Sequence, residues 1–232
     1  LSEMGAGTRQ EVKQYIRKGR VMVDGETALR PEMKVDETKV CVTLDEHKIG
    51  YASYVYYMMN KPAGVVSATE DKKEKTVIDL IEGQKRKDLF PVGRLDKDTV
   101  GLLLITNDGA LAHRLLSPKH HVDKCYFAKV QGKVTKEDIH AFEKGVDIGT
   151  PEEPEMTMPA KLEIINSDEI SEIRLTIQEG KFHQVKRMFQ AVGKEVIYLK
   201  RERMGSLCLD ESLEEGGYRM LTEEELKNYE VL

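Results

Sequence analysis

The sequence has few cysteines and no long hydrophobic run. Its three cysteines, Cys41, Cys125 and Cys208, lie far apart in a chain of 232 residues. An odd number without CxxC spacing argues against a disulfide framework and a zinc site, and indicates free thiols in a reducing cytosol. The most apolar run, Gly101–Ile105, is far shorter than the roughly 20 residues of a membrane-spanning helix. We therefore expect a cytoplasmic protein without a membrane segment.

Signals for targeting, nucleotide binding and metal catalysis are also missing. The first residues show no basic patch followed by an apolar segment, so we expect no signal peptide. Neither a Walker glycine loop nor a GxGxxG motif is present, which excludes the commonest nucleotide-dependent enzymes. No cysteine or histidine pair has metal-ligand spacing, so metal catalysis is not expected. The length fits one large domain or two modest ones.

Charge is distributed unevenly along the chain, whose net charge is −5. Seven lysines and arginines against two glutamates give residues 181–203 a charge of +5. Residues 137–172 instead hold eleven acidic residues against two lysines. A basic segment between acidic ones can form a local positive face on an acidic protein, although a solvated surface explains the charges equally well.

The first 45 or so residues predict a basic helix followed by β-structure. Thr8 and Glu11 have the spacing of a capping box at a helix start. Val12 and Ile16 follow at helical spacing, and Gly19 is suited to end the helix. Five basic residues lie on the other faces of this helix or just after it: Arg9, Lys13, Arg17, Lys18 and Arg20.

Short strands and a linker are expected after this helix. Val21–Glu26 predicts a strand that leads into an Asp-Gly turn, and Val35–Leu44 predicts another short strand region. The polar segment Asp45–Gly50 predicts a linker, and a second domain is expected to begin near Tyr54. Lys85–Lys87 predicts a basic loop.

Apolar patterns in the second domain predict a mixture of strands and helices. Strands are expected at 55–59, 102–106, 126–130, 173–177 and 196–199, and helices at 110–116 and 182–192. Residues 60–64 are expected to turn, because they include a proline and a glycine. Strands mixed with a few helices, without regular βαβ alternation, indicate the α+β class.

The segment Gly93–Asp98 points most clearly to chemistry. Asp96 is placed in a loop directly before a buried strand, where reactive groups are often displayed, and Arg94 could orient or partner it. A carboxylate can act as a nucleophile or as a general base. The structural alternative for a loop aspartate is turn capping, and a glycosidase-like carboxylate pair with Asp98 is a third interpretation.

The segment Lys181–Arg187 places polar groups at the start of the second predicted helix. Free amides at a helix start suit phosphate, and Lys186 and Arg187 would add contacts to an RNA backbone. His183 taken alone is more often a packing or hydrogen-bonded residue than a binding one. Tyr126 could stack on a base or belong to the core. The residues alone therefore indicate an RNA-binding protein of two domains with an aspartate loop of possible catalytic use.

Five segments resemble, in order, the RsuA-type pseudouridine synthases. They are Met59–Ala68, Gly93–Gly109, Glu179–Met188, Lys200–Gly205 and Glu215–Arg219. The first 45 residues resemble the S4 RNA-binding domain that precedes the catalytic domain in this family. The resemblance implies an S4-like domain at 1–46, without its usual first basic helical segment, and a catalytic domain with a mixed, largely antiparallel sheet at 54–232.

This resemblance implies isomerisation of one uridine in ribosomal RNA to pseudouridine, without a metal or cofactor. Asp96 would be the catalytic carboxylate, which attacks the uracil ring or the sugar C1′ or assists glycal formation. Tyr126 would stack on the extruded base and take part in proton transfer, and Lys186 would pair with Asp96. Leu199 would form an apolar wall of the pocket, and Arg94 would order the aspartate loop.

Nine residues are expected to contact RNA: Arg9, Lys13, Arg17, Lys18, Arg20, Lys181, His183, Gln184 and Arg187. His183–Arg187 and Gly216–Arg219 look most like the small-subunit members of the family, whose target is uridine 516 of 16S rRNA. One alternative is the same chemistry on 23S rRNA. Another is a non-catalytic S4-type RNA-binding or ribosome-assembly protein. We expect a monomer that acts on free 16S rRNA or on an assembling small-subunit particle.

Overall fold

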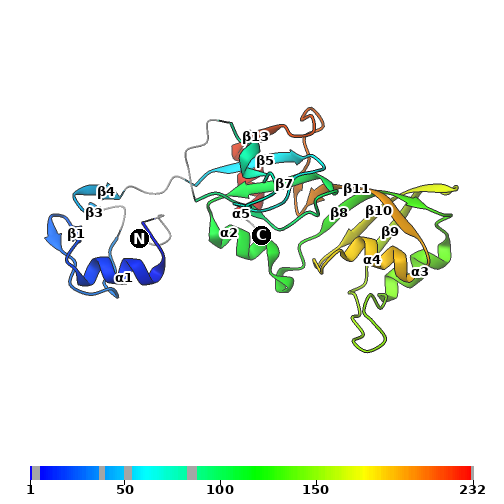
Figure 1. Cartoon of the computed structure of the whole chain (residues 1–232), viewed down its shortest axis with the longest axis horizontal. Helices are drawn as coiled ribbons and strands as arrows, with labels where there is room; N and C mark the ends of the chain where they lie inside the picture. The colour runs from blue at the N-terminus through cyan, green and yellow to red at the C-terminus, as the bar shows by residue number, and fades with distance from the viewer. Residues whose placement is uncertain (2–5, 37–39, 50–53, 83–87, 231–232) are drawn as a thin grey trace. The chain divides into compact units, whose positions relative to one another are not determined.

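The computed structural model describes residues 1, 6–36, 40–49, 54–82 and 88–230, and Figure 1 labels its elements. The chain divides into two compact units, Leu1–Tyr54 and Val55–Leu232. The basic loop expected at 85–87 lies outside the described residues. None of the described helices is long and apolar enough to cross a membrane.

The first unit packs helix α1 (Arg9–Arg17) against a small antiparallel sheet. The predicted capping box is confirmed, because the Thr8 hydroxyl accepts from the Glu11 amide at 3.2 Å and the Glu11 carboxylate accepts from the Thr8 amide at 2.8 Å. The sheet order is β2-β1-β3-β4, with strands β1 (Val21–Val23), β2 (Glu26–Thr27), β3 (Val42–Leu44) and β4 (His47–Ile49). Val12 and Ile16 bury one face of the helix.

The linker prediction for Asp45–Gly50 is wrong over residues 45–49. Asp45 and Glu46 have φ angles of 49° and 66° and form the turn of a hairpin in which β4 pairs with β3. Tight hairpin turns require positive φ at both central positions, and polar residues serve such a turn as readily as a linker. The strand expected at Val35–Leu44 is limited to Val42–Leu44 among the described residues.

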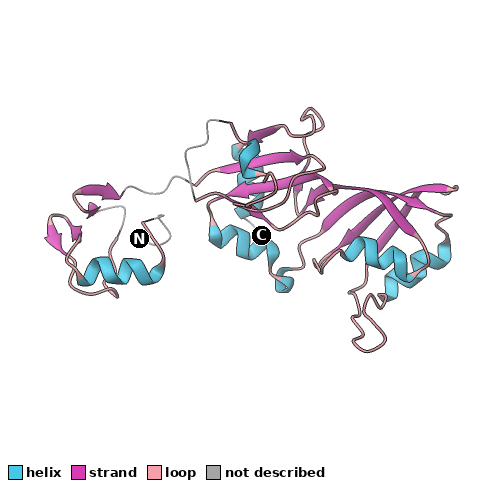
Figure 2. Ribbon diagram, viewed as in Figure 1, coloured by secondary structure: helices cyan, strands magenta, loops and turns pink. Residues whose placement is uncertain are grey.

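The second unit is built on a nine-stranded mixed sheet with helices packed against it (Figure 2). Its strands are β5 (Tyr56–Lys61), β6 (Phe90–Val92), β7 (Val100–Thr106), β8 (Lys124–Gln131), β9 (Lys161–Asn166), β10 (Ile170–Ile177), β11 (Glu195–Met204), β12 (Leu207–Cys208) and β13 (Tyr218–Met220). The order is β13-β5-β7-β11-β8-β10-β9, with β6 paired to β7 and β12 to β11. The mixed sheet and its helices confirm the α+β class.

The helices of this unit are α2 (Gly109–Leu116), α3 (Lys136–Lys144), α4 (Gln184–Ala191) and α5 (Glu223–Glu230), with short 3₁₀ turns at Ile78–Leu80 and Pro118–His120. The predicted strands and the two predicted helices of the second domain are confirmed with shifted bounds. The turn expected at residues 60–64 begins only after Lys61, which is the last residue of β5.

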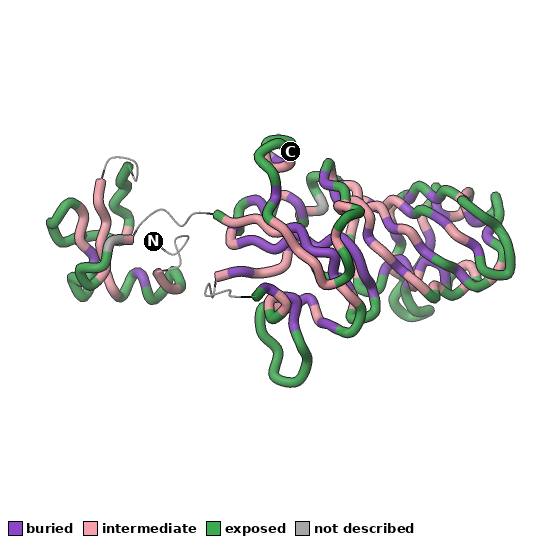
Figure 3. Tube along the Cα trace, turned by 90° about the horizontal axis from the view of Figure 1, so that it is seen from above, coloured by how far each residue is buried: buried purple, intermediate pink, exposed green. Residues whose placement is uncertain are grey.

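Two apolar clusters hold the second unit together, and its buried segments run through the middle of the sheet in Figure 3. The larger cluster packs β8 and β10 against α3 and α4, where Phe142 and Phe189 meet edge to face. The smaller cluster packs Leu102 and Leu104 of β7 against α2 and Tyr229 of α5. Because both of its faces are covered, β7 is buried along its whole length.

Parallel pairing between β7 and β11 joins the two halves of this sheet. Lys200 pairs with Val100, and Arg201 pairs with Gly101, while the other pairs given for the described strands are antiparallel. The strand β11 follows helix α4, and the strand β7 follows the aspartate loop. This junction therefore brings the start of α4 and the aspartate loop to the same place.

Candidate active site

The aspartate loop, residues 93–99, connects β6 to β7 and is held by a buried lysine. Lys61 has no exposed surface, and its Nζ donates to the carbonyl oxygens of Asp96 at 3.0 Å and Thr99 at 2.9 Å. It also donates to the carbonyl oxygen of Pro62 at 3.0 Å. Burial lowers the pKa of Lys61 to about 8, against the opposing charges of Asp98 and Asp96. One ammonium group thereby ties the end of β5 to the backbone of Asp96.

A second set of bonds fixes the loop on the other side of Asp96. The amide of Leu95 donates to the Ser67 hydroxyl at 3.1 Å, and that hydroxyl donates to the Leu95 carbonyl at 2.9 Å. The amide of Gly64 donates to the carbonyl of Lys97 at 2.8 Å. The segment 61–67 therefore supports the loop, whereas its sequence indicated only a turn and part of a family motif.

The ordering role expected of Arg94 stays a prediction, because its side chain makes no hydrogen bond with the described residues of the loop that would test it. Its side chain is exposed and lines the pocket, and no hydrogen bond or ion pair of its guanidinium is found in the part of the chain that the structure describes. The side-chain bonds found for the loop backbone come from Lys61 and Ser67. An exposed guanidinium beside Asp96 is free to meet an anionic ligand such as RNA phosphate.

Two side chains from the segment that opens α4 approach the Asp96 carboxylate. Lys186 Nζ lies 3.3 Å from Oδ2 of Asp96, and His183 Nε2 lies 3.5 Å from its Oδ1. Lys186 also donates to both oxygens of Asp98, at 2.6 and 2.8 Å. Burial alone would lower the pKa of Lys186, but the bond to Asp98 and the charges of Asp96 and Asp98 raise it above its ordinary value. Lys186 therefore carries a positive charge beside Asp96.

Asp98 shares Lys186 with Asp96 and lies farther out. Its side chain is 73% exposed, whereas that of Asp96 is 25% exposed. The hydrogen bond from Lys186 lowers the pKa of Asp98. An exposed carboxylate paired with a lysine is unsuited to act as the acid of a glycosidase-like pair, which needs a raised pKa. This geometry disfavours the paired-carboxylate interpretation.

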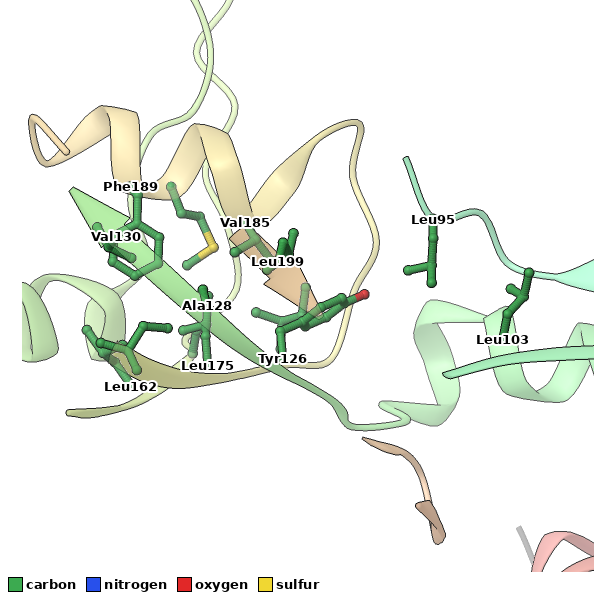
Figure 4. Close-up of a cluster of buried hydrophobic side chains, with 14 of the residues drawn as sticks. Leu95, Leu103, Tyr126, Ala128, Val130, Leu162, Leu175, Val185, Phe189 and Leu199 are labelled. Atoms are coloured by element: carbon green, nitrogen blue, oxygen red, sulfur yellow. The ribbon is translucent and has the colours of Figure 1, made fainter. Parts of the chain in front are cut away.

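The pocket beside Asp96 encloses about 70 Å³ and has an apolar inner wall. Tyr126, from β8, is 8% exposed and lies beside Leu199 of β11 and Val185 of α4, as Figure 4 shows. The hydroxyl of Tyr126 points toward the side of the pocket where Leu95 lies (Figure 4). The pocket thus combines a flat aromatic ring and aliphatic walls with a carboxylate at its rim.

All five residues expected to act in catalysis line this one pocket: Arg94, Asp96, Tyr126, Lys186 and Leu199. Of the residues expected to bind RNA, Lys181, His183 and Gln184 line it as well. These residues come from the aspartate loop, β8, β11 and the segment that opens α4. The sheet junction therefore brings together groups that are up to 105 positions apart in the chain.

Three residues expected to contact RNA have partners inside the protein. Gln184 is buried, and its side chain donates to Glu179 at 2.7 Å and accepts from the Lys181 amide at 2.9 Å. Lys181 Nζ donates to the Met156 carbonyl at 2.9 Å. Arg187 donates to the Glu155 carboxylate at 2.7 Å. These side chains shape the segment that presents His183 and Lys186.

The five basic residues expected to bind RNA in the first unit are all exposed on α1 or just after it. Arg20 is the one with described partners, because its guanidinium pairs with Asp45 and lies 4.4 Å from the centroid of the Tyr15 ring. Arg9, Lys13, Arg17 and Lys18 leave the outer face of α1 strongly basic. Among the described residues, no group of three or more His, Cys, Asp or Glu is placed to hold a metal ion.

Two family models match the chain. The model of RNA pseudouridylate synthase matches residues 55–191, and that of the S4 domain matches residues 1–41. A crystal structure of a pseudouridylate synthase superposes with a TM-score of 0.71 at 35% identity, covering 98% of this chain and 96% of that one.

Curated relatives agree with these matches over nearly the whole chain. An uncharacterized RNA pseudouridine synthase of Bacillus subtilis (strain 168) is 50% identical over 97% of this chain and 94% of its own length. The ribosomal small subunit pseudouridine synthase A of Vibrio cholerae is 44% identical over 94% of this chain and 92% of its own. The protein of the same name from Escherichia coli (strain K12) is 41% identical, over 91% and 89%.

Proposed function

Because this chain belongs to the RNA pseudouridylate synthase family and carries an S4 domain, we propose that it converts one uridine of 16S ribosomal RNA to pseudouridine, with Asp96 as the catalytic carboxylate. The target proposed is uridine 516, the target of the small-subunit members that the sequence resembles most. The observation that carries the proposal is that Asp96, Tyr126 and Lys186, from three separate elements, meet at one pocket. The relatives from Vibrio cholerae and Escherichia coli, named for the ribosomal small subunit, support 16S rRNA as the substrate.

The reaction moves the glycosidic bond without gaining or losing atoms. The bond between N1 of uracil and C1′ of the ribose breaks, the ring turns, and C5 bonds to C1′. C5 then loses its proton, and N1 gains one. A carboxylate serves this sequence by attacking the uracil ring, by attacking C1′, or by assisting formation of a glycal. Each route places Asp96 at the junction of sugar and base.

Lys186 and His183 orient the carboxylate for this role. The Lys186 ammonium lies 3.3 Å from one oxygen of Asp96, so Coulomb attraction holds the carboxylate in position. His183 approaches the other oxygen at 3.5 Å. With the backbone of Asp96 bound by Lys61, both the backbone and the side chain are constrained before the substrate arrives.

The apolar wall suits a base that has left its helix. A uridine cannot react at N1 and C5 while it is stacked, so it must be extruded into the pocket, at a cost of about a few kcal/mol. Tyr126 would stack on the extruded uracil, and Leu199 would close the pocket beside it. The Tyr126 hydroxyl, which points to the side of Leu95, would take part in proton transfer.

Mapping of pseudouridine tests the proposal. The protein and its Asp96→Asn variant are incubated with unmodified 16S and 23S rRNA transcripts, each alone and with ribosomal proteins. Carbodiimide modification and primer extension then locate any pseudouridine. We expect one site, at uridine 516 of 16S rRNA, that is absent with the variant, while the variant binds RNA nearly as tightly as the parent.

The other outcomes each contradict a named part of the proposal. A site in 23S rRNA would keep the chemistry and replace the substrate. Normal turnover by Asp96→Asn would remove Asp96 from the mechanism. RNA binding without product on any transcript, with or without ribosomal proteins, would favour a non-catalytic role in ribosome assembly.

A further inference from the structure

Phe182 exposes its ring to solvent beside the pocket. Its exposed fraction is 75%, whereas Phe142 and Phe189 are fully buried and Phe90 and Phe127 are half-buried. A single exposed apolar side chain is common on protein surfaces. Exposure alone does not indicate a binding site, but the groups around the Phe182 ring also hold it in a fixed position.

Contacts on two sides hold the Phe182 ring and its backbone in place. The ring is stacked on the imidazole of His183, with 3.8 Å between centroids and 19° between planes. Arg187 Nη1 donates to the Phe182 carbonyl at 3.1 Å. His183 has a φ of 48°, in the left-handed region that is unfavourable for residues other than glycine. Such backbone strain persists where the surrounding structure enforces it, and it is concentrated at functional sites.

The stacked pair extends outward from the reacting carboxylate. His183 lines the pocket, and its Nε2 lies 3.5 Å from Asp96 Oδ1. Phe182 stacks on a face of the same imidazole and is exposed to solvent. His183 therefore contacts both the carboxylate of Asp96 and the ring of Phe182. Lys186, on the first turn of α4, adds a positive charge next to this row.

We propose that the stacked rings of Phe182 and His183 form a platform for the unpaired nucleobase next to the target uridine. This inference rests on the proposed function and extends it to a second nucleotide. When the uridine is extruded, its neighbour loses a stacking partner, and an exposed aromatic ring beside the pocket replaces that partner. Proteins that bind unstacked RNA use aromatic side chains in this way. Every base has a flat face, so the platform selects a position in the RNA more than a sequence.

Fluorescence of a base analogue tests the contact directly. A 16S rRNA fragment holding uridine 516 is prepared with 2-aminopurine in place of the 5′ neighbour or of the 3′ neighbour. The full-length protein carries Asp96→Asn throughout, so that no turnover occurs during the binding measurement. One of the two probes is expected to be quenched in the complex, and to become brighter when Phe182→Ala is added. Phe182→Tyr is expected to restore the quenching.

The affinity of the same complexes gives the size of the contact. Phe182→Ala is expected to raise the Kd by about 5- to 150-fold, the range that corresponds to loss of one stacked base. Ile165→Ala is the matched control, because Ile165 is also an exposed apolar residue, at 48%, but lies on β9 and does not line the pocket. The control is expected to leave both fluorescence and affinity unchanged.

An abasic substitution separates stacking from a general loss of structure. Removing the quenched base from the RNA should weaken binding to the parent protein by the same factor as Phe182→Ala. It should have no further effect on the Phe182→Ala protein. The inference would be overturned if the abasic substitution and Phe182→Ala weakened binding independently, so that their losses of affinity added. It would also be overturned if Phe182→Ala left the fluorescence of both probes unchanged. So would a Phe182 effect seen only when ribosomal proteins are present, which would assign the ring to a protein partner.

These measurements do not depend on product formation. If the proposed function is wrong, the protein with Asp96 intact will bind the RNA but will not form pseudouridine in it. If only the platform is wrong, the protein with Asp96 intact will form pseudouridine, and Phe182→Ala will change neither the affinity for RNA nor the fluorescence of the probes.

Discussion

Lys61 does not line the pocket but holds the aspartate loop that does. Its side chain is buried within the unit, and its ammonium donates to the carbonyl groups of Asp96 and Thr99. Buried lysines are rare because removing the charge from water is costly, and such groups are retained when the surrounding polar atoms require them. The carbonyls of the aspartate loop meet this condition.

Replacing Lys61 by methionine is therefore expected to destabilise the protein and displace Asp96. The substitution keeps the apolar stem but removes the donor to the buried Thr99 carbonyl and to the partly buried Pro62 carbonyl, at about 1–3 kcal/mol for a buried group left without a partner. Urea unfolding should show a lower midpoint, and product formation should fall with it. Lys97→Met is the control, because Lys97 is an exposed partner of Glu74 and should leave both nearly unchanged. An unaltered midpoint in Lys61→Met would contradict this account of the loop.

The pH dependence of stability should also report on Lys61. Its folded pKa of about 8 lies below the ordinary value of 10.5, so between these pH values the unfolded chain holds a proton that the folded chain has lost. The free energy of unfolding contributed by Lys61 is expected to increase as the pH rises through this interval. The free energy of unfolding of the parent and of Lys61→Met, measured from pH 7 to 11, gives this contribution. An identical dependence of the unfolding free energy on pH in both proteins would show that the Lys61 pKa is not lowered.

At the scale of secondary structure, the elements with strong apolar periodicity were predictable and the short polar ones were not. Strand β7 is a run of apolar residues, and α4 has Val185, Met188 and Phe189 on one face. Helix α3 was missed, because Phe142 is its single fully buried apolar residue and charged residues dominate the rest. The hairpin at Asp45 was missed because its turn has only two residues, and polar residues occur in linkers as readily as in turns.

The candidate site was predictable only where the chemistry depends on residue type. A loop aspartate and a basic helix start suggested the site, and the family resemblance assigned roles to Asp96, Tyr126 and Lys186. The residues that hold the aspartate loop could not be predicted in this way. Lys61 donates to carbonyls about 35 positions away, and that contact follows from strand pairing rather than from any local pattern.

The β7–β11 pair gives a prediction at the same scale. An added Cβ at Gly101 would lie 2.3 Å from the backbone oxygen of Arg201, and Gly101 has a φ of 99°. Gly101→Ala should therefore separate the two strands and lower the melting temperature sharply. Gly109→Ala is the control, because Gly109 opens α2 with open space around it, and alanine favours a helix by up to about 1 kcal/mol. A Gly101→Ala protein as stable as the parent would refute the close approach.

At the scale of the whole molecule, the chain combines a chemical site in one unit with a basic helix in the other. The net charge of −5 conceals this division, because the basic face of α1 and the basic segment 181–203 are separated by acidic stretches. Contacts with RNA phosphate depend on such local charge, and their strength falls with salt in proportion to the number of phosphates met.

The double variant Lys13→Ala with Arg17→Ala measures the share of α1 in RNA binding. We expect weaker binding and a salt dependence whose slope, log Kd against log salt, is smaller by about 1.4 to 1.8, the value for two phosphate contacts. Lys136→Ala with Lys144→Ala on α3 removes the same charge from another exposed helix and should change the slope less. Equal slopes in all three proteins would mean that α1 does not face phosphate.

The parallel pairing of β7 with β11 has a consequence for synthesis of the protein. The two strands are about a hundred residues apart in sequence, and contacts of such long separation form slowly and late. The pocket needs both strands and also helix α4, which precedes β11 in the chain. A nascent chain therefore has no complete site until residues up to Met204 have left the ribosome. During translation, the basic helix α1 leaves the ribosome well before the last residues of the pocket do.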